Sequence, residues 1–195
     1  MTAIADVRSR RREQTRAEIL DAAWQLAERD SIAGLSLRDL ASEVGMRAPS
    51  LYTYFPSKAA IYDAMFAAGY RELDEATAAI PVDPNDAVGS IAAQVEAFIA
   101  FCQASIPRYQ LLFTRAVPGW EPSEESYAVS VASYARMTEQ LAALRITDPR
   151  HMDLLTALTS GLAAQQLAND PTGSRWRELS SDAAAMYVAH VRRTR

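Results

Sequence analysis

A short stretch around residue 50 carries the side chains with the clearest chemical potential. Arg47 presents a planar fork of donors, which can bind guanine through two hydrogen bonds. Ala48 and Pro49 offer small apolar surfaces that fit a thymine methyl group, although Ala48 is nearly as well explained as a helix former. Ser50 and Thr53 offer hydroxyls to base edges or phosphates. The chemistry that this stretch favours is hydrogen bonding to a nucleic acid.

The sequence offers little for catalysis or for metal binding. Its two histidines, His151 and His190, are expected to lie far apart, and no cysteine or carboxylate set accompanies them at the spacing of a metal site. The single cysteine, Cys102, sits beside Phe98 and Phe101, so we expect a buried side chain and not a nucleophile. No glycine-rich phosphate loop is present. We therefore expect no enzyme, no cofactor and no metal.

Two short helices separated by a glycine turn are predicted to position the stretch around residue 50. Ser36 forms a capping-box pattern with Asp39, so a helix is predicted to start there. Gly45 is its predicted stop, because the residue past a helix end often needs a positive φ. Pro49 fits the first turn of the second helix, where its missing N–H has no partner to lose. Residues 13–30 supply a third, supporting helix, and such a trio presents its last short helix to a DNA major groove.

Helical signals continue through the rest of the chain, without strand alternation or repeats. Ser57 can cap a long helix over residues 57–79, and a linker follows at residues 81–86. Proline and glycine breaks then predict helices over residues 86–105, 107–114, 122–145, 149–168 and 174–193. The predicted fold is all-α, with about nine helices. Its parts are a basic N-terminal arm (1–12), a helix-turn-helix domain (13–60, continuing into helix 57–79) and a larger helical domain for ligand binding and dimerisation (80–195).

The charge distribution fits a protein that touches DNA with one end only. The formal net charge is −4, but residues 1–60 sum to +1 and five arginines crowd residues 8–16. On charge alone, a solvated disordered tail is the simpler interpretation of that basic segment. Residues 1–16 lack the apolar core of a signal peptide, and no apolar run approaches the ~20 residues of a membrane span. These features predict a cytoplasmic protein with no membrane partner.

Residues 13 to about 65 resemble the tetracycline-repressor (TetR) family of regulators. The resemblance depends on four markers at fixed offsets without gaps: Ile19–Ala23, Ser36–Ala41, Gly45, and Leu51–Phe55 followed by Ser57 and Lys58. It implies a bacterial homodimer of all-α subunits, in which the first three helices bind DNA and the rest bind an effector and the partner subunit. One departure is Arg47, which stands where the family often has a Ser or Thr N-cap, so the capping of that helix is in doubt.

The resemblance adds roles for residues around the short helix. It implies that Tyr52 and Tyr54 bind phosphates, although Tyr52 could be a core residue, as Phe55 is expected to be. Lys58 should meet a phosphate at the start of the long helix, and Arg10–Arg12 could enter the minor groove. The predicted DNA-binding residues are Ser36, Arg38, Arg47, Ala48, Pro49, Ser50, Tyr52, Thr53, Tyr54 and Lys58.

The resemblance to the TetR family implies an effector pocket in the larger domain, and the aromatic residues that concentrate after the predicted helix-turn-helix are the candidates to line it. The predicted ligand-binding residues are Phe66, Tyr70, Phe98, Phe101, Cys102, Tyr109, Phe113, Trp120, Tyr127 and Gln165. For any single one of them, a plain core position is the simpler interpretation. The last two helices carry many small residues, including Gly161, Ala164 and Ala185, which suits close packing against a second subunit or, equally, within one subunit.

Together with these observations, the family resemblance implies a ligand-responsive repressor that a small, mostly apolar molecule releases from a double-stranded DNA operator. The homodimer is expected to form through the last two helices. Two alternatives stay open. A helical enzyme with a vestigial helix-turn-helix would turn over a small molecule, and an architectural DNA-binding protein would show weak sequence preference and no ligand-induced release.

Overall fold

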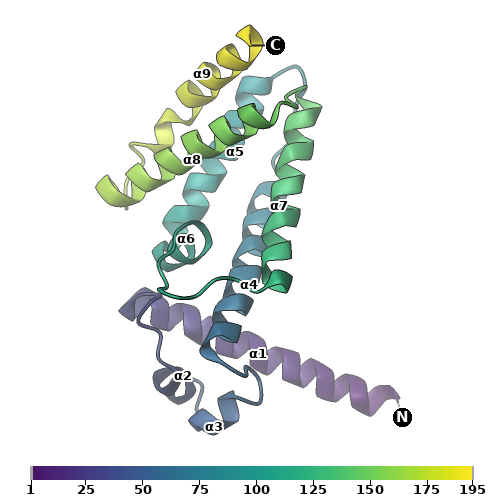
Figure 1. Cartoon of the computed structure of the whole chain (residues 1–195), viewed down its shortest axis with the longest axis vertical. Helices are drawn as coiled ribbons and strands as arrows, with labels where there is room; N and C mark the ends of the chain where they lie inside the picture. Colours follow the sequence, from purple (N-terminus) through teal and green to yellow (C-terminus); the bar gives the residue numbers. More distant parts are fainter. Residues whose placement is uncertain (1, 195) are drawn as a thin grey trace. The chain divides into compact units, whose positions relative to one another are not determined.

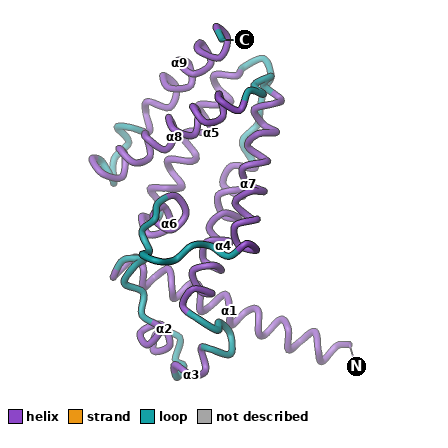
Figure 2. The backbone as a smooth tube through the Cα atoms, viewed as in Figure 1, coloured by secondary structure: helices purple, strands orange, loops and turns teal. Residues whose placement is uncertain are grey.

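The protein is described by a computed structural model that covers residues 2–194, and these residues form helices joined by turns, with no strand among them (Figure 2). The predicted all-α class is confirmed. In chain order the elements are α1 (Thr2–Asp30), α2 (Leu37–Glu43), α3 (Ala48–Leu51), α4 (Lys58–Ala78), α5 (Ala87–Ala104), α6 (Ile106–Phe113), α7 (Glu124–Ala143), α8 (Pro149–Asn169), the 3₁₀ helix η1 (Arg177–Leu179) and α9 (Ser180–Arg193) (Figure 1).

Helix α1 begins much earlier than the sequence pattern predicted. We expected a helix from residue 13 preceded by a separate arm over residues 1–12, whereas the helix runs from Thr2. No proline or glycine interrupts this segment, and Arg, Glu and Gln are good helix formers. The early turns are exposed where they are described, so they lack the apolar periodicity on which the prediction depended.

The chain forms two compact units, and α4 contributes to both. The first unit comprises the chain up to Gly69 together with Pro107–Tyr127, and the second comprises Tyr70–Ile106 together with the chain from Ala128 onward. The division falls inside α4, between Gly69 and Tyr70. The first unit also takes in α6.

The core of the first unit joins the short helices to their supports. Its fully buried side chains include Ile19 of α1, Leu40 of α2, Leu51 of α3 and Ile61 of α4. Within the same unit α4 and α6 approach closely at Gly69, because a Cβ added there would lie 3.0 Å from a methyl carbon of Leu112. A larger residue at this position would require the Leu112 side chain to shift.

Helix α5 is the central helix of the second unit. It packs against α8, α9 and η1 (Figure 1). By length and composition alone it could cross a membrane, so the expectation that no apolar run approaches a membrane span is wrong for this helix. Its apolar residues Ile91, Val95 and Ile99 are buried among its neighbours.

The connection from α8 to α9 is held by one buried amide. Gln166 is 0% exposed, and its Oε1 accepts hydrogen bonds from the backbone N–H groups of Trp176 (2.9 Å) and Arg177 (3.0 Å). Its Nε2 donates to the carbonyls of Asp170 and Gly173. The predicted final helix, 174–193, is therefore divided: η1 occupies Arg177–Leu179, and α9 starts only at Ser180.

Candidate nucleic-acid interface

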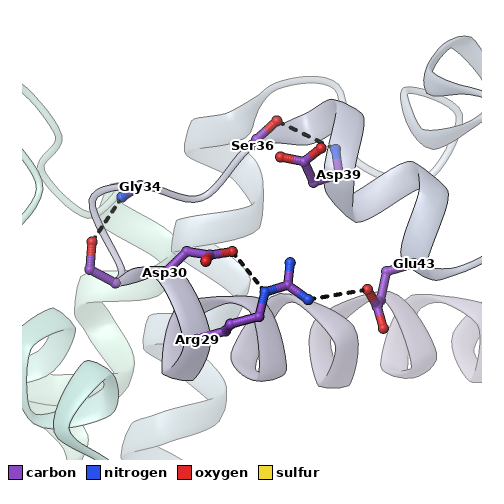
Figure 3. A network of polar contacts seen from close by, with 7 residues as sticks. Arg29, Asp30, Gly34, Ser36, Asp39 and Glu43 are labelled. Atoms are coloured by element: carbon purple, nitrogen blue, oxygen red, sulfur yellow. Dashed lines mark hydrogen bonds and ion pairs between the residues drawn. The ribbon is translucent and has the colours of Figure 1, made fainter.

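Helix α2 starts at the predicted cap. The Ser36 hydroxyl accepts a hydrogen bond from the backbone N–H of Asp39 at 3.4 Å, as the capping pattern indicated (Figure 3). At the other end of α2, the Arg29 guanidinium lies 3.8 Å from the Glu43 carboxylate and donates to Asp30 at 3.0 Å. These contacts tie α2 to the end of α1.

The turn between α2 and α3 depends on Gly45. Its φ of +66° lies in the left-handed region that the sequence predicted there. The backbone N–H of Met46 donates to the carbonyl of Ala41 at 2.7 Å and closes the end of α2. The chain then enters α3 at Arg47, whose side chain makes no capping hydrogen bond. The doubt about capping at this position is therefore confirmed.

Helix α3 is a single turn whose geometry is set by its neighbours. It spans Ala48–Leu51, and the next residues continue in tight turns, with the N–H of Tyr54 donating to the carbonyl of Leu51 at 2.9 Å. Leu51 and Phe55 are each 1% exposed and anchor this segment in the core. The expected burial of Phe55 is confirmed.

The predicted DNA-binding residues gather around this anchored segment. Tyr52 is 51% exposed, so the alternative that it is a core residue is wrong. The Thr53 hydroxyl donates to the carbonyl of Ser50 at 2.7 Å, which leaves its oxygen to accept. The exposed members of the predicted set are Arg38, Arg47, Pro49, Ser50, Tyr52 and Thr53, and the half-buried members are Ser36, Ala48, Tyr54 and Lys58.

Two arginines of α1 bind the far end of the α3 segment. Arg12 Nη2 donates to the carbonyl oxygen of Thr53 at 2.6 Å, and Arg16 donates to the carbonyl oxygen of Tyr54. Their guanidinium carbons also lie over aromatic rings, Arg12 over Tyr54 at 5.5 Å and Arg16 over Phe55 at 4.1 Å from the ring centroids. Arg12, which was predicted to enter the DNA minor groove, is therefore hydrogen-bonded within the protein instead. Sequence reasoning missed this contact because the partners lie about forty residues apart.

Lys58 lies at the first position of α4. The Ser57 hydroxyl accepts from the N–H of Ala60 at 3.1 Å, which confirms the predicted cap. The Lys58 ammonium lies 5.4 Å from the centroid of the Tyr62 ring. Burial raises the pKa of the Tyr62 phenol to about 12, and its hydroxyl donates to the carbonyl of Ile32 at 2.9 Å. A cation therefore sits at a helix N-terminus whose free N–H groups also attract anions.

The predicted ligand-binding residues fall in both units. In the first unit, Trp120 lies 5.9 Å from Phe66, and Tyr109 lies 6.1 Å from Phe113, between ring centroids. Tyr127 is 56% exposed near the start of α7.

In the second unit, the same predicted set differs in burial. Phe101 and Cys102 are buried, which agrees with a core position for the cysteine, and Tyr70 and Phe98 are half-buried. Gln165 is exposed and accepts from Asn169 at 2.7 Å. The inward-facing amide is that of the next residue, Gln166, which the sequence pattern did not single out.

Some small residues of α8 and α9 pack within the subunit, which was one of the two roles left open, and others are exposed. Ala163 and Ala184 are completely buried within the subunit. On the outer side, Gly161 is exposed with no atom within 4 Å of a Cβ added there, and Met186 is 66% exposed.

The expectation that the two histidines lie far apart is wrong, because the ring centroids of His151 and His190 are 6.0 Å apart.

The geometry of α1–α3 defines a helix-turn-helix protein. Residues 19–65 match the family model described as "Bacterial regulatory proteins, tetR family". The chain is 36% identical over 76 residues to the HTH-type transcriptional regulator EthR of Mycolicibacterium smegmatis, and the match covers 37% of this chain and 35% of that protein. The matched segment thus spans about a third of the length of the curated relative.

Solved structures extend the similarity in fold over most of the chain. A tetR-family transcriptional regulator from Streptomyces coelicolor matches with a TM-score of 0.69 and 22% identity, covering 91% of this chain and 80% of that one. A TetR variant from Acinetobacter baumannii AYE in complex with minocycline matches with a TM-score of 0.60 and 17% identity, covering 91% and 96%. The predicted resemblance is confirmed for the segment at residues 19–65, which matches the family model of tetR bacterial regulatory proteins, and the solved structures extend the similarity in fold alone.

Proposed function

We propose that this protein is a sequence-specific, DNA-binding transcriptional regulator that acts in the cytoplasm as a ligand-responsive repressor. One observation carries the proposal: a one-turn helix is anchored by buried Leu51 and Phe55, while Arg47, Ser50 and Tyr52 stand exposed beside it. This arrangement frees hydrogen-bonding side chains for a DNA groove and fixes the backbone that carries them.

The proposed contacts divide into base reading and phosphate binding. Arg47 reads a guanine, because its guanidinium is exposed and makes no capping bond. Tyr52, Tyr54 and Lys58 bind phosphates and set the register of the protein on the duplex. Ser36, Arg38, Ala48, Pro49, Ser50 and Thr53 complete the proposed surface.

The proposed functional domains are those expected from the sequence, with residues 13–60 for DNA and residues 80–195 for effector and dimer contacts. Exposed Gly161 and Met186 support dimerisation through α8 and α9, because both offer apolar or small surface to a symmetry mate. The effector is proposed to be a small, mostly apolar molecule, since the predicted binding residues are largely aromatic. Its binding changes operator affinity only if it favours one spacing of the two recognition helices, with coupling of about 1–3 kcal/mol.

The proposal is tested by selecting genomic DNA fragments with the purified full chain and measuring binding to the selected site. Arg47→Ala should relax preference at one base pair, at a cost of about 1–3 kcal/mol for the preferred base. Lys58→Ala should weaken all sequences alike and lower the slope of log K against log salt by about one. Arg29→Ala is the matched control, because it removes an exposed cation that is paired with Asp30 and Glu43. Wild-type binding by both test variants would refute the assigned roles.

A further inference from the structure

The only two histidines of the chain lie against each other in the second unit, and the function proposed above does not use them. His151 belongs to the first turn of α8 and His190 to the last turn of α9, and these ends meet because the two helices run antiparallel (Figure 1). The ring centroids are 6.0 Å apart and the ring planes are perpendicular. His151 is buried and His190 is half-buried, so the pair is reached from solvent on the side of His190.

A hydrogen bond to Thr194 holds the ring of His151 in place. Its Nε2 lies 3.0 Å from the hydroxyl of Thr194, and that hydroxyl donates its proton to the carbonyl of His190, also at 3.0 Å. In the tautomer in which Nε2–H donates to this hydroxyl, the lone pair of His151 lies on Nδ1. The carbonyl of His151 in turn accepts from the hydroxyl of Tyr187 at 3.0 Å.

This arrangement matches the support that surrounds metal-binding histidines elsewhere. Such histidines donate their other ring N–H to an oxygen, which fixes the ring and raises the basicity of the ligating nitrogen. An imidazole nitrogen lies about 2 Å from a bound zinc ion, so two rings on one ion have centroids roughly 5–6 Å apart. The observed spacing of 6.0 Å falls at the upper end of that range.

We propose that His151 and His190 form a site for one divalent transition-metal ion of the class that prefers imidazole: Cu²⁺, Ni²⁺ or Zn²⁺. The ligands are Nδ1 of His151 and a ring nitrogen of His190, and Thr194 is a positioning residue. Among residues 2–194 no group of three or more His, Cys, Asp or Glu side chains forms a metal cluster, so water completes the coordination. With two protein ligands the affinity follows the general order of divalent ions, in which Cu²⁺ binds most tightly.

The test uses the full chain without a polyhistidine tag, freed of metal by a chelator and loaded with one equivalent of Cu²⁺. Because the chain has two histidines, every imidazole nitrogen in the electron paramagnetic resonance spectrum comes from this pair. We expect the signature of two equatorial nitrogens, and a melting temperature that rises with the concentration of Cu²⁺ or Ni²⁺. Mg²⁺, which prefers oxygen ligands, should leave the melting temperature unchanged.

Three variants separate ligation from packing. His190→Gln should lose one nitrogen and bind Cu²⁺ at least tenfold more weakly, and because this side chain is half-buried the variant should fold. Thr194→Val should keep both nitrogens but bind about 10–100-fold more weakly, as expected for a supporting oxygen. Thr172→Val, at an exposed position of the turn between α8 and η1, is the matched control and should bind like the wild type.

Two results would overturn the proposal. One is Cu²⁺ bound without imidazole nitrogens, which identifies adventitious binding elsewhere on the surface. The other is wild-type Cu²⁺ affinity in His190→Gln, which shows that the paired rings are packing alone. Neither result depends on whether the protein binds DNA, so this proposal and the proposed function fail separately.

Discussion

Replacing Arg16 by alanine should destabilise the first unit although Arg16 lies outside α3. The guanidinium donates to the carbonyl of Tyr54 and stacks on the ring of Phe55, and the side chain is half-buried. A hydrogen bond to a charged group contributes about 1.5–3 kcal/mol, and a cation–π contact contributes about 0.5–2 kcal/mol. Because the two contacts share one side chain their contributions overlap, so we expect a loss of about 2–3 kcal/mol.

The loss is measured by urea unfolding followed by circular dichroism and by the melting temperature. For a chain of this size, about 2–4 °C is lost per kcal/mol, so the melting temperature should fall by roughly 4–12 °C. Arg16→Lys keeps the charge but not the planar fork, and should recover less than half of the loss. Arg29→Ala, whose ion pairs are exposed, should cost about 0–1 kcal/mol.

DNA binding gives a second readout for Arg16. If Arg16 acts only through α3, Arg16→Ala should weaken binding without changing the slope of log K against log salt, whereas a lost phosphate contact lowers that slope by about one. A stability equal to that of Arg29→Ala, or a lower salt slope, would refute the structural role assigned to Arg16.

Three further outcomes follow from the structure. Gly45→Ala should lower the free energy of unfolding by about 1–2 kcal/mol in chemical unfolding, because the φ of +66° disfavours a Cβ although the space around it is open. Gly45→Asn should lower it less, and equal losses in the two variants would contradict this explanation. Gln166→Leu should cost about 3 kcal/mol by leaving two part-buried N–H groups without their acceptor, whereas exposed Gln165→Leu should change stability by less than about 0.5 kcal/mol. The pKa of Tyr62 rises from its ordinary value of 10 to about 12 on folding, so the folded state holds more protons and stability should fall as the pH rises through this window. Unfolding measured between pH 10 and 12 should show a shallower fall in Tyr62→Phe, and an unchanged slope would contradict the shift.

Local signals predicted those parts of the fold that depend on local interactions. The caps at Ser36 and Ser57 and the positive φ of Gly45 depend on residues within one turn, and the structure shows each of them. The start of α1 was missed because its early turns are polar and exposed, so they show no apolar periodicity. The helix forms there because its residues have high helix propensity.

Contacts between distant segments could not be predicted from the sequence. The bonds from Arg12 and Arg16 to the α3 segment join residues about forty positions apart, and His151 and His190 meet only because α8 and α9 run antiparallel. The choice between Gln165 and Gln166 as the inward-facing amide depends on the rotation of α8 about its axis. Such placements are set by packing, for which a single sequence gives no pairwise signal.

In the α3 segment, the residues that anchor the backbone differ from the residues that face outward, and this has an evolutionary consequence. Leu51 and Phe55 hold the segment in place, whereas Arg47, Ser50 and Tyr52 point outward and contribute little to the core. Substitutions at outward positions usually change stability by less than about 0.5 kcal/mol. A duplicated copy of this gene could therefore acquire a different DNA target through a few substitutions on that face, and each variant along the way would still fold.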